Sequence, residues 1–346
     1  MVFSEASFDG HEKVLFCTDA ATGLKAIIAI HSTRLGPAAG GCRMFPYPSE
    51  PAALDDVLRL SRAMTFKNAL AGLRLGGGKS VILGDPADPQ AGARLTAFGK
   101  CIDALGGAYW TAEDVGVNLD GVEQIARSTQ FVFGTRSGQA ATGDPSAFTA
   151  RGVYAGLRAA VRHRLERDSV AGLRVAVQGV GSVGWELCKQ LHADGAALIV
   201  ADRNPQFAAR AGRELGAAVV EIDAIHRAEA DVFAPCALGG TLNARTIPEL
   251  KASVVAGAAN NPLQEPADGA ALRAQGVLYA PDFIVNAGGM MHASGEIFGA
   301  YDEAAVAREI EGIYDTVLAV CRRADIEDTQ PELVAIKLAE ARLAAG

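Results

Sequence analysis

The sequence lacks the features that would place the chain in a membrane, outside the cell or on a nucleic acid. It has no run of about 18 uninterrupted apolar residues, which a transmembrane helix would need. Its start has no basic region followed by an apolar segment, so no secretion signal is expected. Lysine and arginine number 32 against 40 acidic residues, and the formal net charge of -8 argues against nucleic acid and anionic membrane as partners. We expect a soluble, cytoplasmic protein that acts on a small molecule.

Cysteine and histidine are few, and neither shows a metal-binding pattern. The six cysteines are scattered without CxxC spacing, which is typical of reduced thiols in a long intracellular chain. The six histidines likewise show no spacing suited to a metal. We therefore expect neither disulfides nor a bound metal. The cysteines are Cys17, Cys42, Cys101, Cys188, Cys236 and Cys321, and the histidines are His11, His31, His163, His192, His226 and His292.

Length and turn residues favour two domains. A chain of 346 residues exceeds what one hydrophobic core usually serves, and two domains also create a cleft. The plainest break is the polar, glycine-containing run at 135–145. We predict one α/β domain at 1–136 and a second at 137–330, with a cleft between them. The segment 331–346 is predicted to be a helix that packs back on the first domain.

Hydrophobic periodicity indicates an α/β fold in both halves. Upstream of the break, 24–30 is typical of a buried strand and 53–67 of an amphipathic helix. Downstream, helices and strands alternate, which favours a parallel sheet. Apolar runs up to 277–289 predict that this sheet continues to about residue 287, and the pattern is helical from 302 to the end. The alternating elements are a helix at 148–165, a strand at 173–178, a helix at 185–193 and a strand at 196–202.

A glycine-rich turn marks the expected cofactor site. The segment 179–184 is GVGSVG, a GxGxxG pattern between a predicted strand and the helix expected from about Trp185. Its first glycine permits the tight turn, its second lets a pyrophosphate approach the backbone, and its third lets helix and strand pack closely. This context identifies 137–330 as a Rossmann-type dinucleotide-binding domain. The cofactor-binding candidates in the turn are Gly179, Gly181, Ser182, Val183 and Gly184.

The end of the next strand indicates which dinucleotide binds. Asp202 follows the motif by about 20 residues, where a carboxylate accepts hydrogen bonds from the adenosine ribose hydroxyls. An acid there repels the 2′-phosphate of NADP and so favours NAD, although the adjacent Arg203 leaves the strictness of this preference open. The alternative is that the glycines only form a tight turn and that Asp202 is a solvated strand end.

Two lysines and an acidic pair in the first half are candidates for catalysis. Lys79 follows three glycines and precedes an apolar run, and Lys67 lies in the segment AMTFK. A lysine at the edge of a buried strand, near a second cation, is destabilised in its charged form and can exchange protons. Asp114, with Glu113 as the weaker candidate, can trade a proton with a nearby lysine. The alternatives are a snorkelling lysine on a glycine-rich turn and an acid that caps a helix or lies in an exposed turn.

Seven motifs, in order along the chain, resemble those of one enzyme family. They are LGPAAGGCR (35–43), AMTFK (63–67), GGGKS (76–80), TAEDVG (111–116), GVGSVG (179–184), AGAANN (256–261) and PDFIVNAGG (281–289). Together they resemble the leucine, phenylalanine and valine dehydrogenases of the glutamate dehydrogenase superfamily. The resemblance runs from about Thr18 to Gly289. It implies a substrate and catalytic domain at 1–136, oxidation of a hydrophobic L-amino acid by NAD to the 2-oxo acid and ammonia, and assembly as a homo-oligomer.

The resemblance also implies roles for the residues at matching positions. Lys79 matches the catalytic lysine that assists water attack and stabilises the carbinolamine, and Asp114 matches its proton-shuttling partner. Since Lys79 must be neutral to act as a base, activity should rise toward alkaline pH. The residues implied for the substrate carboxylate are Lys67, the backbone around Gly41 and the amide of Asn260. The residues implied for the nicotinamide side are Thr149, Asn286, Cys236 and Ala237, with Cys236 a lining residue rather than a nucleophile.

The implied side-chain pocket is apolar. Its lining residues, by the resemblance, are Ala39, Ala112, Met290 and Ala293, none of which can bind the γ-carboxylate of glutamate. Ala39 stands where many leucine enzymes have a larger residue, and Ala293 is small, so an aromatic ring has room. Ala112 in its AEDVG context is leucine-like. A methylene-scale fit changes binding by only about 1 to 3 kcal/mol, so we predict a phenylalanine- or leucine-type substrate, with a slight preference for phenylalanine.

Two other classes of protein are the alternatives. A catalytically inactive NAD-binding regulator would keep the glycine motif but would not need Lys67, Lys79 and Asp114 together. A 2-hydroxy-acid dehydrogenase typically uses a histidine base and an arginine for the carboxylate, whereas the matching positions here are lysines. We therefore predict a reversible NAD-dependent amino-acid dehydrogenase.

Overall fold

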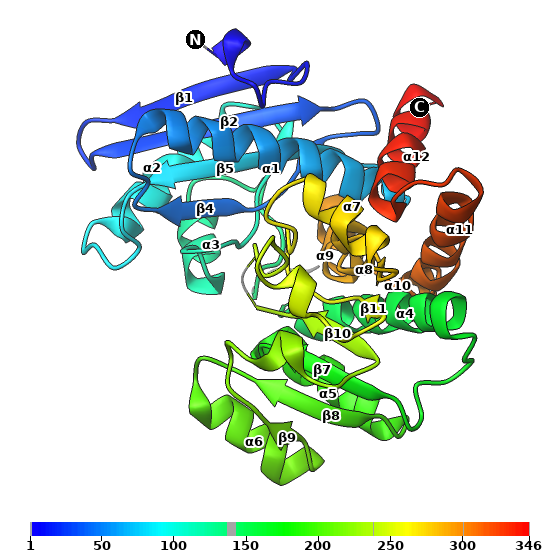
Figure 1. The fold of residues 1–346 in the computed structure, drawn as a ribbon. Helices are drawn as coiled ribbons and strands as arrows, with labels where there is room; N and C mark the ends of the chain where they lie inside the picture. Colours follow the sequence, from blue (N-terminus) through cyan, green and yellow to red (C-terminus); the bar gives the residue numbers. More distant parts are fainter. Residues whose placement is uncertain (1, 137–142, 238, 300, 346) are drawn as a thin grey trace. The chain divides into compact units, whose positions relative to one another are not determined.

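The chain folds as two compact α/β units, and most of their elements are labelled in Figure 1. The computed structural model describes residues 2–136, 143–237, 239–299 and 301–345. The two-domain α/β fold class predicted from the sequence is confirmed. The predicted boundary run at 135–145 falls partly on 137–142, which lie outside the described residues. The first unit comprises Met1–Asp144, Ala293–Asp302 and Ala339–Gly346, and the second comprises Pro145–His292 and Glu303–Leu338.

The sheet of the first unit is mixed. Its strand order is β1-β2-β5-β3-β6, and β4 also pairs with β5. β1 with β2 and β2 with β5 are antiparallel, whereas β3 and β4 pair with β5 in parallel. The predicted strand at 24–30 and helix at 53–67 are both present, each slightly longer than expected. The elements are β1 (Lys13–Asp19), β2 (Leu24–Ser32), β3 (Ala38–Ala39), β4 (Cys42–Phe45), α1 (Glu50–Leu70), β5 (Gly76–Leu83), α2 (Ala91–Asp103), β6 (Tyr109–Trp110) and α3 (Leu119–Ala126).

Different helices cover the two faces of this sheet. Because successive side chains of a strand point to opposite faces, Ile28 and Ile30 of β2 face a core that includes Phe98 of α2. Ile27 faces the opposite core, which contains Val57 of α1. In the neighbouring strand β5, Val81 belongs to the core with α1 and Ile82 to the core with α2. Helix α1 therefore packs on one face of β5.

Strand β5 contains the glycine run before Lys79, which corrects the alternative of a glycine-rich turn. A Cβ at Gly77 would lie 2.1 Å from the backbone nitrogen of Thr65 in α1, and a Cβ at Gly78 would lie 2.7 Å from the ring of Tyr109. Glycine is disfavoured in strands, but here the close approach of α1 on one face and Tyr109 on the other leaves no room for side chains. Lys79 is therefore an internal residue of a buried strand and not at its edge.

The sheet of the second unit is parallel. Its order, β12-β11-β10-β7-β8-β9, is that of doubly wound dinucleotide-binding sheets, 3-2-1-4-5-6 when read from β9 with β7 as the first strand. The inner strands of such sheets are buried on both faces and have apolar sequences, which made them predictable, whereas the edge strand β9 is exposed and was not predicted. The strands are β7 (Arg174–Gln178), β8 (Ala197–Ala201), β9 (Ala218–Val219), β10 (Val232–Pro235), β11 (Val254–Val255) and β12 (Leu278–Tyr279), and the helices include α4 (Ser146–Leu165), α5 (Ser182–Ala193), α6 (Pro205–Leu215), α7 (Ala267–Ala274), α10 (Glu303–Glu311) and α11 (Ile313–Ile326).

The apolar run at 277–289 is only partly a strand. β12 ends at Tyr279, and after Pro281 the chain forms α8 (Asp282–Val285) and α9 (Gly288–Phe298), so the prediction that the sheet continues to about 287 is wrong. A short apolar run does not distinguish a buried strand from a buried helix. The helix expected from about Trp185 also begins earlier, at Ser182 inside the glycine motif.

The C-terminal helix α12 (Pro331–Ala345) contributes its last turns to the first unit. The guanidinium of Arg342 donates hydrogen bonds of 2.8 Å to the carbonyl oxygens of Ala69 and Leu70. A cation at this position adds hydrogen bonds to carbonyls in the last turn of α1 and complements the helix dipole. No helix within the described ranges combines the length and hydrophobicity of a membrane span.

Two histidines lie together in the first unit, His11 buried and His31 partly buried. His31 Nδ1 lies 2.8 Å from the Thr65 hydroxyl, and the His31 ring is 4.8 Å from the ring of His11. Burial, with a contribution from His11, lowers the pKa of His31 from 6.5 to about 4. Between these two pH values the folded chain keeps this imidazole neutral, whereas the unfolded chain protonates it.

This difference predicts a loss of stability in mild acid. Because the pKa of His31 is lower in the folded chain, the contribution of this residue to the free energy of unfolding is fully present above pH 6.5 and is lost as the pH falls toward 4. Over this range the free energy of unfolding should fall by on the order of 2 kcal/mol. Urea unfolding across this range should show a flatter pH dependence for His31→Gln. The exposed His192, changed to Gln, is the matched control. Equal slopes for His31→Gln and the wild type would contradict the prediction.

Candidate active site

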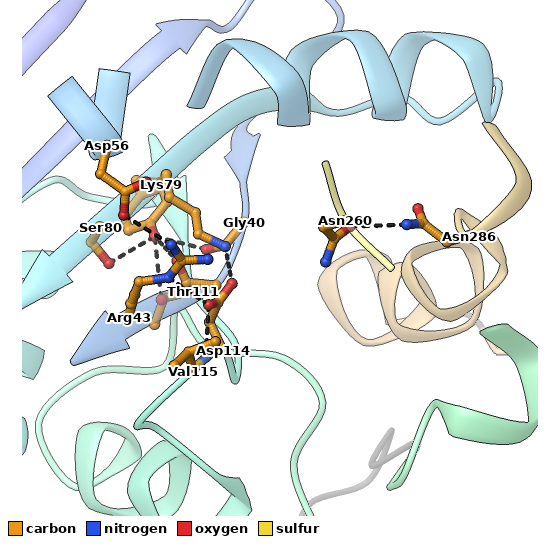
Figure 2. Close-up of polar contacts among 12 residues, drawn as sticks. Gly40, Arg43, Asp56, Lys79, Ser80, Thr111, Asp114, Val115, Asn260 and Asn286 are labelled. Atoms are coloured by element: carbon orange, nitrogen blue, oxygen red, sulfur yellow. Dashed lines mark hydrogen bonds and ion pairs between the residues drawn. The ribbon is translucent and has the colours of Figure 1, made fainter. Parts of the chain in front are cut away.

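Lys79 forms a buried ion pair in the first unit. It lies on the same face of β5 as Gly77, which contacts α1, because alternate residues of a strand share a face. Its amine donates a hydrogen bond to Oδ2 of Asp114, and its side chain is 6% exposed. Figure 2 shows the two side chains directed toward each other from β5 and from the segment that follows β6. A desolvated amine beside one carboxylate can exchange a proton with a bound substrate or water.

Asp114 is held as a carboxylate. Its Oδ1 accepts hydrogen bonds from the Val115 backbone nitrogen at 2.6 Å and from Arg43 Nε at 3.0 Å, while Oδ2 faces Lys79. Burial by itself would raise the pKa, but the charges of Lys79 and Arg43 outweigh burial and lower the pKa of Asp114 to about 2. The pKa of Glu113, the weaker candidate, is raised by burial and by neighbouring carboxylates. The structure thus brings Asp114 to the lysine.

Arg43 and its partners are site residues that the sequence reasoning missed. Arg43 Nη1 lies 2.9 Å from Oδ2 of Asp56, an α1 residue, and the Tyr47 hydroxyl donates to the same oxygen at 2.6 Å. Figure 2 shows Arg43 between Asp56 and Asp114. Arg43 ends the motif at 35–43, which could have drawn attention to it. Asp56 has no comparable signal, because an acid on an amphipathic helix is usually a solvent-facing residue.

Two predicted substrate-binding positions lie on segments fixed against β5. Lys67 is half-buried in the last turn of α1, and the next residue, Asn68, donates a 2.6 Å hydrogen bond to the carbonyl oxygen of Gly76. Gly41 lies between β3 and β4, where a Cβ would be 2.2 Å from the carbonyl oxygen of Glu113. Strand β5 therefore positions both Lys79 and the helix end that carries Lys67.

Tyr109 is a second residue that the sequence reasoning missed. Its hydroxyl donates to the Gly40 carbonyl oxygen at 2.7 Å and lies 3.0 Å from the Ser80 hydroxyl, and its ring is fully buried. Burial raises the pKa of Tyr109, so the phenol stays neutral. It joins the glycine loop before β4 to the strand that carries Lys79.

The predicted pocket residues are buried and uncharged. Ala39 in β3 pairs with Gly77 of β5 and is fully buried, and Ala112 follows β6. Ala112 and Ala293 are buried in the first unit, and Met290 is buried in the second. None of the four positions carries a charged or polar side chain.

The glycine motif of the second unit forms the turn from β7 to α5. Gly179 has a φ of 91°, in the left-handed region that favours glycine, and a Cβ at Gly184 would lie 2.0 Å from the carbonyl oxygen of Gly179. A Cβ at Gly181, by contrast, would meet no described heavy atom within 4 Å beyond its chain neighbours. Ser182 and Val183 begin α5, whose first N–H groups have no helical acceptor. The open space at Gly181 beside this helix end fits the approach of a pyrophosphate.

Asp202 is fixed beside this turn. Its Oδ2 accepts a hydrogen bond from the Val180 backbone nitrogen at 2.7 Å, and its Oδ1 accepts one from the Asn204 nitrogen at 2.8 Å. These contacts orient the carboxylate while leaving each oxygen further lone pairs for ribose hydroxyls. The adjacent Arg203 is exposed.

Asn286 carries a buried acceptor that nothing in the described chain satisfies. Its Nδ2 donates to Asn260 Oδ1 at 2.9 Å, as Figure 2 shows, and to the Ala258 carbonyl oxygen at 3.2 Å. Its Oδ1 is buried and has no hydrogen-bond partner among the described residues. Because an unsatisfied buried carbonyl is costly, this oxygen fits a donor such as the N–H of a carboxamide. The contact also joins two residues that the sequence assigned to substrate and cofactor.

The other predicted cofactor residues lie at the ends of elements in the second unit. The Thr149 hydroxyl, in the first turn of α4, donates to the Pro145 carbonyl oxygen at 3.1 Å. The backbone nitrogen of Cys236, just after β10, donates to the Gln178 carbonyl oxygen at 2.7 Å, and Ala237 is exposed. Burial raises the pKa of Cys236 to about 12, which argues against a thiolate nucleophile.

Neither thiols nor acids form a metal centre in the part of the chain that the structure describes. All six cysteines are free. No cluster of three or more histidine, cysteine, aspartate or glutamate side chains in the described ranges is arranged to hold a metal ion.

Comparisons with known proteins point to one family. The family description "Glu/Leu/Phe/Val dehydrogenase, dimerisation domain" matches residues 11–131, and "Glutamate/Leucine/Phenylalanine/Valine dehydrogenase" matches 205–339. Leucine dehydrogenase of Bacillus cereus is 48% identical over 334 residues, which is 96% of this chain and 91% of that protein. L-tryptophan dehydrogenase of Nostoc punctiforme is 43% identical over 344 residues, 99% of this chain and 96% of that protein. The crystal structure of L-tryptophan dehydrogenase from Nostoc punctiforme matches with a TM-score of 0.84 at 42% identity, covering 97% of this chain and 96% of that one.

Proposed function

The chain belongs to the Glu/Leu/Phe/Val dehydrogenase family, and on that premise we propose that it reversibly oxidises a hydrophobic L-amino acid to the 2-oxo acid and ammonia. It is an amino-acid dehydrogenase, an oxidoreductase that acts on CH–NH2 donors, and its cofactor is NAD. The observation that carries the proposal is the buried pair of Lys79 and Asp114, which supplies the proton transfers that amine oxidation requires. An inactive regulator would have no use for such a pair.

Lys79 and Asp114 are proposed to act on the reacting atoms. Bound NAD would supply the hydride acceptor for Cα, and this oxidation would give the iminium carbon that water attacks. The neutral amine of Lys79 takes a proton from the water that attacks this carbon, and the resulting ammonium stabilises the carbinolamine. Asp114 holds the ammonium and relays its proton to the carbinolamine nitrogen. The C–N bond then breaks to release ammonia, the carbonyl of the 2-oxo acid forms, and the hydroxyl proton goes to the amine of Lys79. Because Lys79 must be neutral at the start, oxidation should become faster toward alkaline pH.

The remaining residues are proposed to bind and orient. Lys67, the backbone at Gly41 and the amide of Asn260 would hold the substrate carboxylate and so direct Cα toward the hydride acceptor. We propose 1–136 as the substrate and catalytic domain and 137–330 as the NAD-binding domain, which also supplies Asn260, Met290 and Ala293 to the substrate. The residues proposed for NAD are Gly179, Gly181, Ser182, Val183, Gly184, Asp202, Arg203, Thr149, Cys236, Ala237 and Asn286.

The substrate is proposed to be of the leucine or phenylalanine type. The residues assigned to its side chain, Ala39, Ala112, Met290 and Ala293, are buried and apolar, so they would leave the second carboxylate of glutamate without a partner. The similarity to leucine and tryptophan dehydrogenases supports both a branched and an aromatic side chain.

NADH formation from a panel of amino acids tests the proposal. With NAD at alkaline pH, L-leucine and L-phenylalanine should give much higher kcat/KM than L-glutamate, with L-valine and L-tryptophan included for ranking. The expected gap to glutamate is about a hundredfold or more, because burying an unpaired carboxylate costs several kcal/mol. Measurable NAD binding without turnover of any amino acid would favour the inactive regulator.

Self-association is proposed as well. Residues 11–131 match a dimerisation domain, and β1, near the start of that match, lies at the edge of the first unit's sheet, where it pairs with β2 alone among the described strands. Phe16 on this strand is 58% exposed. An edge strand with an exposed aromatic residue suits association with a second copy of the chain, so we propose a homo-oligomer.

A further inference from the structure

Arg43 links the catalytic pair to a second carboxylate. Its Nε lies 3.0 Å from Oδ1 of Asp114, and its Nη1 lies 2.9 Å from Oδ2 of Asp56. With Lys79 the side chains form a row of alternating charge (Figure 2). We propose that Arg43 is a positioning residue of the catalytic pair and that its charge, balanced by Asp56, sets how strongly Asp114 holds the lysine proton. The inference rests on the proposed function, because it concerns the same pair.

The geometry shows how Arg43 orients Asp114. One carboxylate oxygen, Oδ1, is occupied by Arg43 Nε and by the Val115 backbone nitrogen, which leaves Oδ2 for Lys79. Arg43 belongs to β4, which pairs in parallel with β5, and Asp56 belongs to α1. The guanidinium therefore ties the segment that carries Asp114 to both the strand and the helix of the site.

Burial makes these charges effective. The exposed fractions of the side chains are 6% for Lys79, 16% for Asp114, 23% for Arg43 and 17% for Asp56. Charges so placed are screened much less by solvent and salt than surface pairs. Asp114 divides its attraction between two cations, so Arg43 weakens its hold on the ammonium form of Lys79. Asp56 in turn offsets part of the charge of Arg43.

The titratable groups nearest to Lys79, Asp114, Arg43 and Asp56 are neutral or exposed. Burial raises the pKa of Cys42 to about 12 and also raises the pKa values of Tyr47 and Tyr109, so all three remain neutral. Arg59 contacts Asp56 Oδ1 at 3.8 Å but is 64% exposed and hence screened. The other charged groups on the surrounding segments, unchanged in the variants below, are Glu113 after β6, Lys25 on β2, and Glu50, Asp55, Arg62 and Lys67 on α1.

Two single substitutions should shift the pH profile in opposite directions. Asp56→Asn is nearly isosteric and can still accept from Arg43 and Tyr47, but it frees the full positive charge of Arg43 to act on Asp114. The acid limb of kcat/KM for amino-acid oxidation should then move to lower pH. Arg43→Met leaves both carboxylates to stabilise the ammonium, so the limb should move to higher pH. Each shift is expected to be about 0.5 to 1 pH unit.

The double variant Arg43→Met with Asp56→Asn separates charge from structure. It restores the net charge around Lys79, so its acid limb should return close to that of the wild type, although its kcat stays low because Asp114 has lost its orienting contact. Arg94→Met is the matched control, since it removes a cation paired with Asp88 at 3.0 Å in the same unit but outside this row of charges. Its profile should not move.

The outcomes distinguish this inference from the proposed function. Lower kcat with unmoved acid limbs, or shifts of the same sign in both single variants, would show that Arg43 and Asp56 have a structural role only. If Arg43→Met fails to fold, as judged by circular dichroism and NAD binding, the test depends on Asp56→Asn alone. An acid limb of Asp56→Asn that stays in place or moves to higher pH would then overturn the inference. A wild-type chain that oxidises no amino acid would overturn the proposed function and the inference with it.

Discussion

Replacing Lys79 with methionine is expected to lower kcat for amino-acid oxidation by about a thousandfold while NAD affinity is unchanged, because a positioned acid–base group typically contributes 10² to 10⁴ in rate. Methionine keeps the length and apolar stem of the lysine inside β5 and removes only the amine. Asp114 keeps Arg43 as a cationic partner at 3.0 Å, so the substitution does not leave an unpaired buried carboxylate. Steady-state NADH formation measures kcat, and calorimetric titration measures NAD affinity.

A second lysine of the same sheet provides the control. Lys25 lies on β2, which pairs with β5, but its side chain is exposed. Lys25→Met removes the same charge and should leave kcat near that of the wild type. A Lys79→Met enzyme with near wild-type kcat would remove this lysine from the mechanism. Loss of NAD binding together with kcat would instead indicate that the substitution disturbs the fold.

The sequence predicted the second unit well because its signals are local. Each strand of a parallel sheet is a short apolar run, and the cofactor motif is a turn within one βαβ unit. The segment after Tyr279 was predicted incorrectly, since Asp282–Val285 is as apolar as a strand, and only Pro281 hints that a helix begins there. Periodicity over so few residues does not separate the two structures.

In the first unit the prediction depended on contacts that a sequence does not display. Glycines normally weaken a strand, so the run before Lys79 left a glycine-rich turn open as the alternative to a buried strand. The close approach of Thr65 and Tyr109 instead requires glycines in β5. Lys79 and Asp114 were candidates from their sequence setting, and the resemblance to a known family supplied the roles proposed for them. Asp56 was missed because it resembles its exposed neighbour Asp55 on α1, and only the position of Arg43 in the fold distinguishes the two acids.

Two glycines of the cofactor motif should respond differently to alanine, with Gly184→Ala lowering stability and Gly181→Ala lowering NAD affinity. At Gly184 a Cβ would lie 2.0 Å from the Gly179 carbonyl oxygen and 3.3 Å from the Cys236 Cβ, so α5 must move away from the turn. Overpacking against backbone of this kind should destabilise the second unit by about 3 kcal/mol or leave it unfolded. Urea unfolding should show the lower stability, and NAD binding should be lost with the fold.

At Gly181 the expected result is a normal fold that binds NAD poorly. A Cβ there meets no described heavy atom beyond the chain neighbours within 4 Å, and the φ of -66° suits alanine, so the unfolding midpoint should match that of the wild type. The methyl group would nevertheless occupy the space through which a pyrophosphate approaches the helix end, and NAD affinity should fall by about tenfold or more.

Gly92→Ala in α2, also unobstructed, is the control, and it should change neither the unfolding midpoint nor the NAD affinity. If Gly181→Ala binds NAD as tightly as the wild type, the pyrophosphate does not lie at this turn. If the variant unfolds at a lower urea concentration than the wild type, Gly181 is required by the fold and its loss of NAD binding would not identify a pyrophosphate site.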